Sequence, residues 1–289
     1  MQLLNIGSTI TLRRGAYRFT KQRSYADDNQ TLAFEAIGIG GKGDSKPFFV
    51  KLAPVKGENN RVTTDSIVLR QEKRVYETLG EGDHLTPSFW DHGKVVAYDE
   101  DFYVIVREFR PGKSLEETPN IPLNLFMKVM KEAVATLTKY EQAGFIHGDL
   151  CPGHLLLSPD NQFTLFDPIG YPINRNGNII NRVHGLGRHK FMPPEDHTNS
   201  SNVHPVLKVS RLRDVFAIGT IFYKAFQASS YLYCSDFMRQ LDPLRQKATA
   251  VPINTRYTSM AELEKDFNAV FTDTIMRNIT GYVNFSRYS

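Results

Sequence analysis

The sequence has little of what a secreted, membrane or nucleic-acid-binding protein needs. Its 289 residues include only two cysteines, Cys151 and Cys234, so we expect no disulfide framework and a reducing compartment. No apolar run approaches 18 residues, and the amino-terminal stretch lacks the apolar core of a signal peptide. The net charge of +4 is well below the clustered excess of a dedicated nucleic-acid binder, although it suits anionic ligands. We therefore expect a cytoplasmic protein with no membrane partner and no nucleic-acid partner.

What is present is an ordinary globular composition, with strands concentrated in the first part of the chain. Residues 8–52 contain four segments rich in β-branched and aromatic residues, separated by Gly, Asp and Asn turns, and these segments predict strands. Residues 63–80 predict a helix that begins at a Thr or Asp cap and ends at Gly80. Residues 94–109 predict a pair of strands around the turn "DED".

After the Pro-Gly of "RPGKS" the pattern becomes helical. Apolar periodicity predicts helices at residues 124–144, 213–227 and 259–271, the last with a Ser cap. The sequence therefore predicts an α+β protein in two parts, a strand-rich part at residues 1–109 and a helical part at residues 110–289.

Two aspartates in short turns are the first candidates for chemistry. Asp149 lies in "HGDLCPGH" and Asp167 in "LFDPIG", 18 positions later, and a hairpin around "PDNQ" between them would bring both carboxylates to one edge. Two carboxylates together with His154 could serve a divalent cation and a transferring phosphoryl group. Each Asp could equally be a turn residue, because Asp is common in turns.

Along nearly the whole length of the chain, a series of motifs resembles those of the eukaryotic-type, Ser/Thr protein kinase family, in the same order. "FFVK" is similar to the lysine motif of strand three, "RQEKRVYETL" to the helix that carries its acidic partner, and "VIVREFRPGKSL" to the hinge. "HGDLCPGH" resembles the catalytic loop, "FDPIG" the magnesium loop and "FMPPED" the end of the activation segment. "RLRDVFAIG" and "NTRYTSMAEL" resemble the helices that support this loop and segment.

This resemblance implies a bilobal fold and the transfer of the γ-phosphate of ATP, with Mg²⁺ or Mn²⁺, to a protein hydroxyl. The implied anchors of phosphotransfer are charged: Lys51 with its partner Glu72, the acceptor-orienting Asp149, and Asp167 with His154 at the metal. The residues that the resemblance places in the adenine pocket are Glu108, Phe109 and Leu156. The resemblance also implies an ion pair between Glu195 and Arg256, and support of the catalytic loop by Asp214.

The phosphate loop departs from the family. The Gly-rich residues 38–46 precede Lys51 too closely to be that loop, so we expect them to form the turn between two strands. The corresponding loop would be residues 21–30, which contain no glycine. There Arg23 and Ser24 could replace backbone amides in binding phosphate, or the loop could be a solvated hairpin tip.

Other departures favour different functions. Gly148, Cys151 and His154 stand where the family has Arg, Lys and Asn. Phe49 replaces a small residue over the adenine, and Arg107 occupies the gatekeeper position, unless Phe49 packs in the core and Arg107 pairs with an acid. The alternatives are a pseudokinase that acts as a binding or scaffold module, and a small-molecule kinase, which shares the "HGD" triplet.

The activation segment lacks the usual phosphorylation sites. Between residues 168 and 195 there is no Ser or Thr, and Tyr171 carries the only hydroxyl. We therefore expect a segment that phosphorylation does not switch on. Its basic residues could attract an acidic protein substrate or regulatory partner, or could simply face water.

Overall fold

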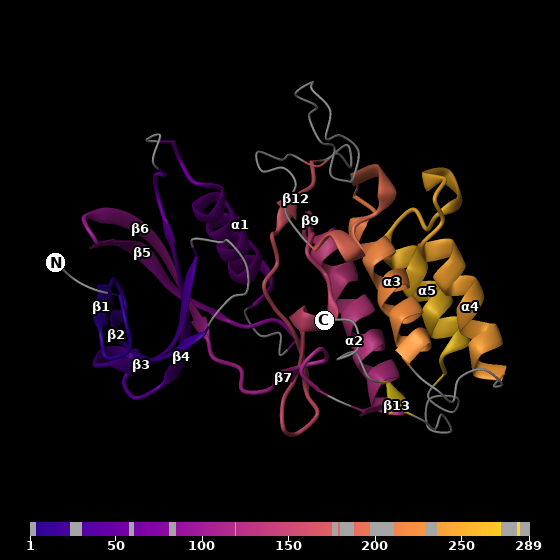
Figure 1. Ribbon diagram of the computed structural model, residues 1–289, viewed down its shortest axis with the longest axis horizontal. Coiled ribbons are helices and arrows are strands. Elements are labelled where there is room, and N and C mark those ends of the chain that lie inside the picture. Colours follow the sequence, from indigo (N-terminus) through magenta and orange to yellow (C-terminus); the bar gives the residue numbers. More distant parts are fainter. Residues whose placement is uncertain are drawn as a thin grey trace. The chain divides into compact units, whose positions relative to one another are not determined.

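A computed structural model describes residues 4–23, 31–57, 61–80, 85–118, 120–174, 179, 188–196, 211–228, 236–272 and 282–283. The chain divides into two compact units, residues 1–110 (unit 1) and residues 111–289 (unit 2). The described residues form a strand-rich sheet and five α-helices, so the expected α+β class is confirmed (Figure 1).

Unit 1 is built on a six-stranded antiparallel sheet with the order β1-β2-β3-β4-β6-β5. The strands are β1 (Thr9–Leu12), β2 (Gly15–Arg23), β3 (Leu32–Ile39), β4 (Pro47–Pro54), β5 (Phe89–Ala97) and β6 (Glu100–Glu108). Side chains alternate between the two faces of a strand. On β4, Phe48, Val50 and Leu52 therefore enter the larger apolar core on one face. Lys51 lies on the other face together with Ala53, which packs with Leu69 of α1.

Helix α1 (Thr64–Leu79) covers that second face, and its ends are those expected from the sequence. The side chain of Thr63 accepts a hydrogen bond from the backbone N–H of Ser66, at 3.1 Å, which is an N-cap. Gly80 follows the last turn, and its N–H donates to the carbonyl of Tyr76. The buried residues Leu69, Glu72 and Tyr76 recur at helical spacing, so Glu72 is placed on the face that meets the sheet.

Two loops of unit 1 were predicted from the sequence, the Gly-rich residues 38–46 and the turn at "DED". Residues 41–43 form a short turn between β3 and β4, so the Gly-rich segment is a strand connection, as expected. The turn between β5 and β6 consists of Tyr98 and Asp99, both with positive φ, and β6 begins at Glu100. The predicted turn at "DED" was therefore about one residue too late, because Glu100 and Asp101 pair with β5. Residues 24–30 lie outside the described residues.

Unit 2 contains the other four helices, α2 (Leu123–Gln142), α3 (Arg213–Ala228), α4 (Asp236–Ala248) and α5 (Met260–Val270). Helix α2 packs against α5, and α3 packs against α4 (Figure 1). Phe222 lies at the centre of this core, with its ring 6.1 Å from Phe126 and 5.8 Å from Phe267. No helix within the described ranges is both long enough and apolar enough to cross a membrane.

Short strands frame the turns of unit 2. The three-stranded sheet has the order β11-β10-β7, and β9 pairs with β12, as β8 does with β13. Their bounds are β7 (Lys113–Ser114), β8 (Ile121–Pro122), β9 (Phe145–Ile146), β10 (Leu155–Leu157), β11 (Phe163–Leu165), β12 (Tyr171–Pro172) and β13 (Tyr282–Val283). The β10–β11 hairpin confirms the one expected around "PDNQ". It connects the turn that carries Asp149 to the turn that carries Asp167.

Candidate functional site

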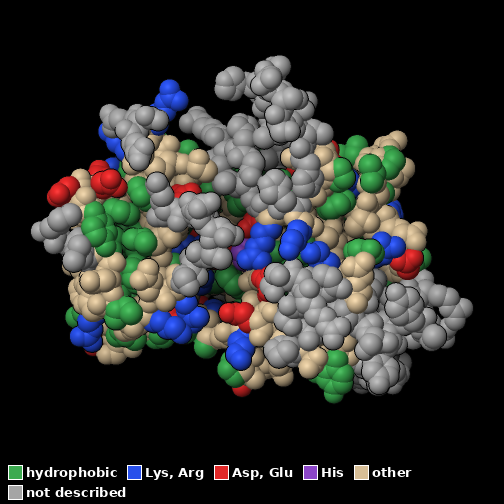
Figure 2. Space-filling view, viewed as in Figure 1, with side chains coloured by type: hydrophobic (Ala, Val, Ile, Leu, Met, Phe, Trp, Pro, Cys, Tyr) green, Lys and Arg blue, Asp and Glu red, His purple; other side chains and the backbone are tan. Residues whose placement is uncertain are grey.

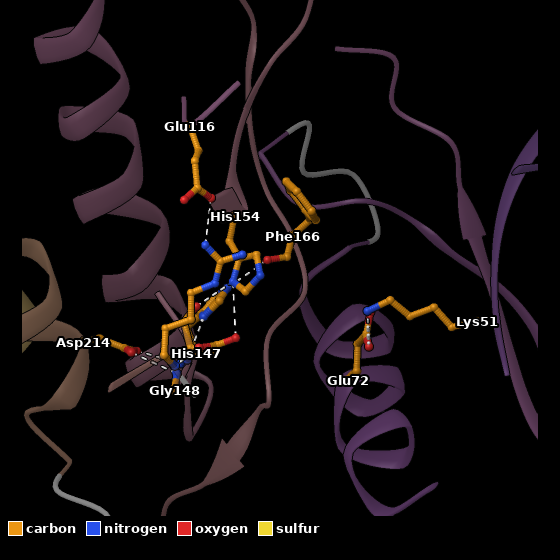
Figure 3. Close-up of polar contacts among 10 residues, drawn as sticks. Lys51, Glu72, Glu116, His147, Gly148, His154, Phe166 and Asp214 are labelled. Carbon is orange, nitrogen blue, oxygen red and sulfur yellow. Dashed lines mark hydrogen bonds and ion pairs between the residues drawn. The ribbon is translucent and has the colours of Figure 1, made fainter. Parts of the chain in front are cut away.

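The predicted ion pair of unit 1 is present and almost completely buried. The Nζ atom of Lys51 lies 3.0 and 2.9 Å from the two carboxylate oxygens of Glu72 (Figure 3). Lys51 is 6% exposed and Glu72 is 1% exposed. Strand parity directs Lys51 toward α1 and helical spacing directs Glu72 toward the sheet, which explains why the two side chains meet. The ammonium is therefore held by both oxygens of one carboxylate.

Two of the unusual residues of unit 1 pack against each other beside Lys51. The register of β4 and β6 places Phe49 opposite Arg107, and the guanidinium carbon of Arg107 lies 4.3 Å from the centre of the Phe49 ring. The same guanidinium lies 5.8 Å from the centre of the Tyr76 ring. Both Phe49 and Arg107 are buried, so this is a desolvated cation–π contact. Phe49 shares its face of β4 with Lys51, two residues away.

Two of the other residues assigned to nucleotide binding in unit 1 form ion pairs within that unit. Glu108 lies at the end of β6 and pairs with Arg110 at 2.8 Å. Arg23 ends β2 and forms an ion pair with Glu35. Phe109 follows β6 and is half-buried. Ser24 lies outside the described residues, so its part in phosphate binding stays a prediction.

In unit 2, Asp214 holds the turn before Asp149 through its backbone. Its two carboxylate oxygens accept hydrogen bonds from the N–H groups of His147, at 2.6 Å, and Gly148, at 2.9 Å (Figure 3). Burial raises the pKa of Asp214 to about 6, and these two backbone N–H donors oppose the rise. Asp214 therefore supports this turn, as the resemblance implied.

Gly148 explains one departure from the family. Its φ is +81°, a conformation that favours glycine, and an added Cβ would lie 2.5 Å from the ring of Tyr171. Tyr171 is completely buried on β12, so the ring has little room to move. The arginine that the family places here does not fit this turn without rearrangement.

Asp149 is held at several points by its surroundings. Its backbone N–H donates to Nδ1 of His147 at 3.2 Å, and its carbonyl lies 2.6 Å from Nδ1 of His154. Because Nδ1 of His147 accepts, the Nε2–H of His147 donates to the carbonyl of Phe166, at 3.0 Å (Figure 3). In the side chain of Asp149, Oδ1 accepts from the backbone N–H of Arg188 at 2.8 Å. The side chain remains 19% exposed, so a reactant could still reach it.

The role of His154 as a metal ligand stays a prediction, and two features of its surroundings count against it. Burial alone would lower the pKa of His154, but the facing Cys151, Asp149 and Asp167 outweigh it and raise this pKa to about 10. A protonated imidazole has no lone pair to offer a metal. In addition, the Nδ1 atom of His154 is already used by the carbonyl of Asp149. The expectation assumed a neutral ring, which the surrounding anionic groups disfavour.

Asp167 offers a chemically suitable oxygen donor. It is buried and has a φ of +57°, which Asp tolerates better than most residues. Within the described ranges, no group of three or more His, Cys, Asp or Glu residues is placed to hold a metal. Magnesium is commonly held by one or two carboxylates together with substrate phosphates, so the side chain of Asp167 suits such a site, and its contact with a metal stays a prediction.

Two further predictions from the sequence concern unit 2. The expected ion pair between Arg256 and Glu195 is present, with two N–O distances of 2.6 and 3.2 Å and a completely buried Arg256 side chain. Leu156, assigned to the adenine pocket, lies on β10 between Thr164 and Ser114 of the neighbouring strands. Its contact with a nucleotide stays a prediction.

Sequence analysis counted Arg188 only among the basic residues of the activation segment, and it did not single out Glu116. These residues are 72 positions apart and form an ion pair of 2.7 Å next to Asp149. On the face seen in Figure 2, several Lys and Arg side chains gather with acidic side chains beside them. A single acidic residue after β7 has no local pattern that distinguishes it from its neighbour Glu117.

Comparison with known proteins gives a weak and partial likeness to kinases. No protein-family model matches the chain. A protein named "Serine/threonine-protein kinases drp72" from Corynebacterium efficiens is 25% identical over 166 residues, which cover 54% of this chain and 29% of that protein. "Serine/threonine-protein kinases PknA" from Corynebacterium glutamicum is 23% identical over 189 residues, which cover 60% of this chain and 37% of that protein. The chain therefore spans less than two fifths of either relative, and the likeness points to a kinase-like family at most.

Proposed function

We propose that this chain is a divergent protein kinase-like phosphotransferase that moves the γ-phosphate of ATP to a protein hydroxyl. The observation that carries the proposal is the buried ion pair between Lys51 and Glu72. A buried ion pair adds little to stability compared with apolar side chains of similar size. Its presence is better explained by function, because an ammonium held in place can bind the phosphates of a nucleotide.

The other charged residues would divide the reaction between them. Asp149 would orient the acceptor hydroxyl and take its proton while the acceptor oxygen bonds to the γ-phosphorus. The bond from that phosphorus to the oxygen of ADP then breaks, and ADP leaves. Asp167 would hold the Mg²⁺ or Mn²⁺ ion that neutralises phosphate charge. Glu108, Phe109 and Leu156 would contact the adenine.

The acceptor proposed here is a protein of acidic character, in the cytoplasm. The support for acidic character is the exposed side chain of Lys190, close in sequence to Arg188, whose backbone N–H contacts Asp149. Opposite charge raises the rate of encounter and excludes partners of like charge. The cytoplasmic setting rests on the low cysteine content.

A second candidate function is a pseudokinase that binds partners without transferring phosphate. The observation that favours it is the contact between Phe49 and Arg107, on the face of the sheet that carries Lys51. The family has a small residue in place of Phe49, so a stacked ring and guanidinium would narrow the space for adenine. In this function the charged anchors would bind a nucleotide weakly or not at all.

Nucleotide binding and turnover, measured side by side, separate the two functions. We expect ATP with Mg²⁺ or Mn²⁺ to raise the melting temperature of the wild type, because a ligand at 100 times its Kd adds about 2.7 kcal/mol. Lys51→Met should lose most of this shift, whereas Lys73→Met, in a surface pair of α1, should keep it. Phosphate transfer to an acidic protein would favour the enzyme. A thermal shift without transfer would favour the pseudokinase, and the absence of both would refute nucleotide binding.

A further inference from the structure

Arg188 contacts the site through both its backbone and its side chain. Its backbone N–H donates to Oδ1 of Asp149 at 2.8 Å, and its Nη1 atom donates to Oε2 of Glu116 at 2.7 Å. In Figure 3 a dashed line marks this contact at the carboxylate of Glu116. The side chains of Arg188 and Glu116 are 46% and 26% exposed, respectively. The segment that contains Arg188 is thus attached to Asp149 at one point and to Glu116 at another.

The ion pair packs on the short turn that carries His154. A Cβ atom added to Gly153 would lie 2.6 Å from Oε2 of Glu116 and 3.1 Å from both terminal nitrogens of Arg188. The ends of both side chains therefore lie directly against this turn, and a larger residue at position 153 would displace them. The same turn continues to His154, whose Nδ1 lies 2.6 Å from the carbonyl of Asp149. The short turn Pro152–His154 therefore contacts both the ion pair, at Gly153, and the backbone of Asp149, through His154.

The loop that carries Glu116 is itself fixed by its neighbours. The side chain of Glu117 accepts from the N–H of Ser114 at 2.9 Å, and the N–H of Glu117 donates to the hydroxyl of Ser114 at 3.2 Å. This reciprocal pair closes the turn after β7, as a capping box does. Glu116 is thereby presented from a closed turn, while the adjacent Glu117 serves the turn itself.

The energetics of the pair point to positioning. A partly exposed ion pair contributes little to stability, so holding the fold together is a poor explanation for it. Burial would lower the pKa of Arg188, but Cys151, Glu116 and Asp149 outweigh it and raise this pKa, so the guanidinium stays charged. A carboxylate has about four lone-pair directions, so the amide donor on Oδ1 of Asp149 and the ion pair of Oδ2 with Nδ1 of His154, at 3.6 Å, still leave Oδ2 able to accept a proton.

We propose that Glu116 and Arg188 are positioning residues for Asp149. The ion pair fixes the backbone of Arg188 so that its N–H holds Oδ1, and Oδ2 is then directed to the acceptor hydroxyl. This inference rests on the proposed phosphotransfer function. It also gives residues 188–196 an attachment that needs no Ser or Thr between residues 168 and 195, since the carboxylate of Glu116 binds the guanidinium of Arg188. Phosphate and its arginine in the catalytic loop are then not needed.

Hydrogen exchange at the Arg188 amide tests the hold on Asp149 without requiring activity. Glu116→Gln keeps the shape of the side chain and removes its charge, and Glu117→Gln makes the same change one residue away. We expect exchange of this amide, read by mass spectrometry on a peptide containing it, to be up to about fivefold faster in Glu116→Gln, in line with the loss of one exposed ion pair. Glu117→Gln should exchange as the wild type does, because Gln can also complete a capping box. Unchanged exchange in Glu116→Gln would overturn the proposal.

Kinetics on the same variants test positioning. We expect Glu116→Gln to lower kcat by about tenfold with KM for ATP unchanged, because a misplaced base weakens the chemical step. The charge swap Glu116→Arg/Arg188→Glu should recover part of the lost kcat at low salt. A rise of kcat in Glu116→Gln would overturn the proposal, because the segment would then block Asp149. If the wild type has no turnover but its Arg188 amide is protected by Glu116, the proposed function fails and the hold on Asp149 stands.

Discussion

Removing the carboxylate of Glu72 without changing its size tests why the buried ion pair of unit 1 exists. In Glu72→Gln the ammonium of Lys51 stays almost completely buried and loses its two carboxylate contacts, at 3.0 and 2.9 Å. Breaking one partner of a buried pair costs about 3–5 kcal/mol, because a charge is left uncompensated. We therefore expect the free energy of unfolding to fall by about 3 kcal/mol, measured as a lower urea midpoint at an unchanged m-value.

The matched control replaces both partners by apolar side chains. Lys51→Met/Glu72→Leu leaves no buried charge, so we expect its stability to equal or exceed that of the wild type, by about 0–4 kcal/mol. Its ATP affinity should nevertheless be lost, because the ammonium is gone. A double variant as unstable as Glu72→Gln would refute the reasoning, since the pair would then be needed for the fold itself.

Three more predictions concern single positions. Gly148→Ala should lower the free energy of unfolding by about 1–3 kcal/mol in urea, because its φ of +81° and the Tyr171 ring disfavour a side chain, and unchanged stability would contradict this. The pKa of His154 is raised from 6.5 to about 10, so its contribution to stability is complete below pH 6.5 and is lost as the pH rises toward 10. As the pH rises from 6.5 to 10, the melting temperature of His154→Gln should therefore fall less than that of the wild type. A parallel fall in both proteins would contradict the raised pKa of His154. Phe49→Ala should tighten ATP binding in calorimetry, because it removes the ring on which Arg107 stacks, and weaker binding would show that Phe49 supports the nucleotide.

Local patterns in the sequence were enough to predict the elements that carry the candidate residues. Alternation of side chains predicted β4, and helical spacing with a Thr cap predicted α1, so the contact between Lys51 and Glu72 could be expected. Helix α4 was not predicted. Pro243 lies inside it, and proline normally indicates the end of a helix. Leu241, Leu244 and Ala248 recur at helical spacing and are buried, so packing against α3 and α5 stabilises the helix despite the proline.

Contacts between distant residues were beyond the sequence. The stacking of Arg107 on Phe49 depends on the register of β4 against β6, which was not known beforehand. The protonation of His154 could not be predicted for a related reason, because it depends on anionic groups that folding places around the ring. Residue type alone indicates a ligand in such cases, while the environment decides whether a lone pair is available.

Transfer of the labelled γ-phosphate of ATP to an acidic protein, in wild type and in Asp149→Asn, tests the central claim most directly. The Asn side chain keeps an oxygen that can accept the N–H of Arg188, but it cannot take up the proton of the acceptor hydroxyl. The account predicts phosphorylated product from the wild type and a rate at least about a hundredfold lower in the variant, the usual contribution of a positioned base. Equal rates in the two proteins, or no transfer by the wild type with either Mg²⁺ or Mn²⁺, would contradict it.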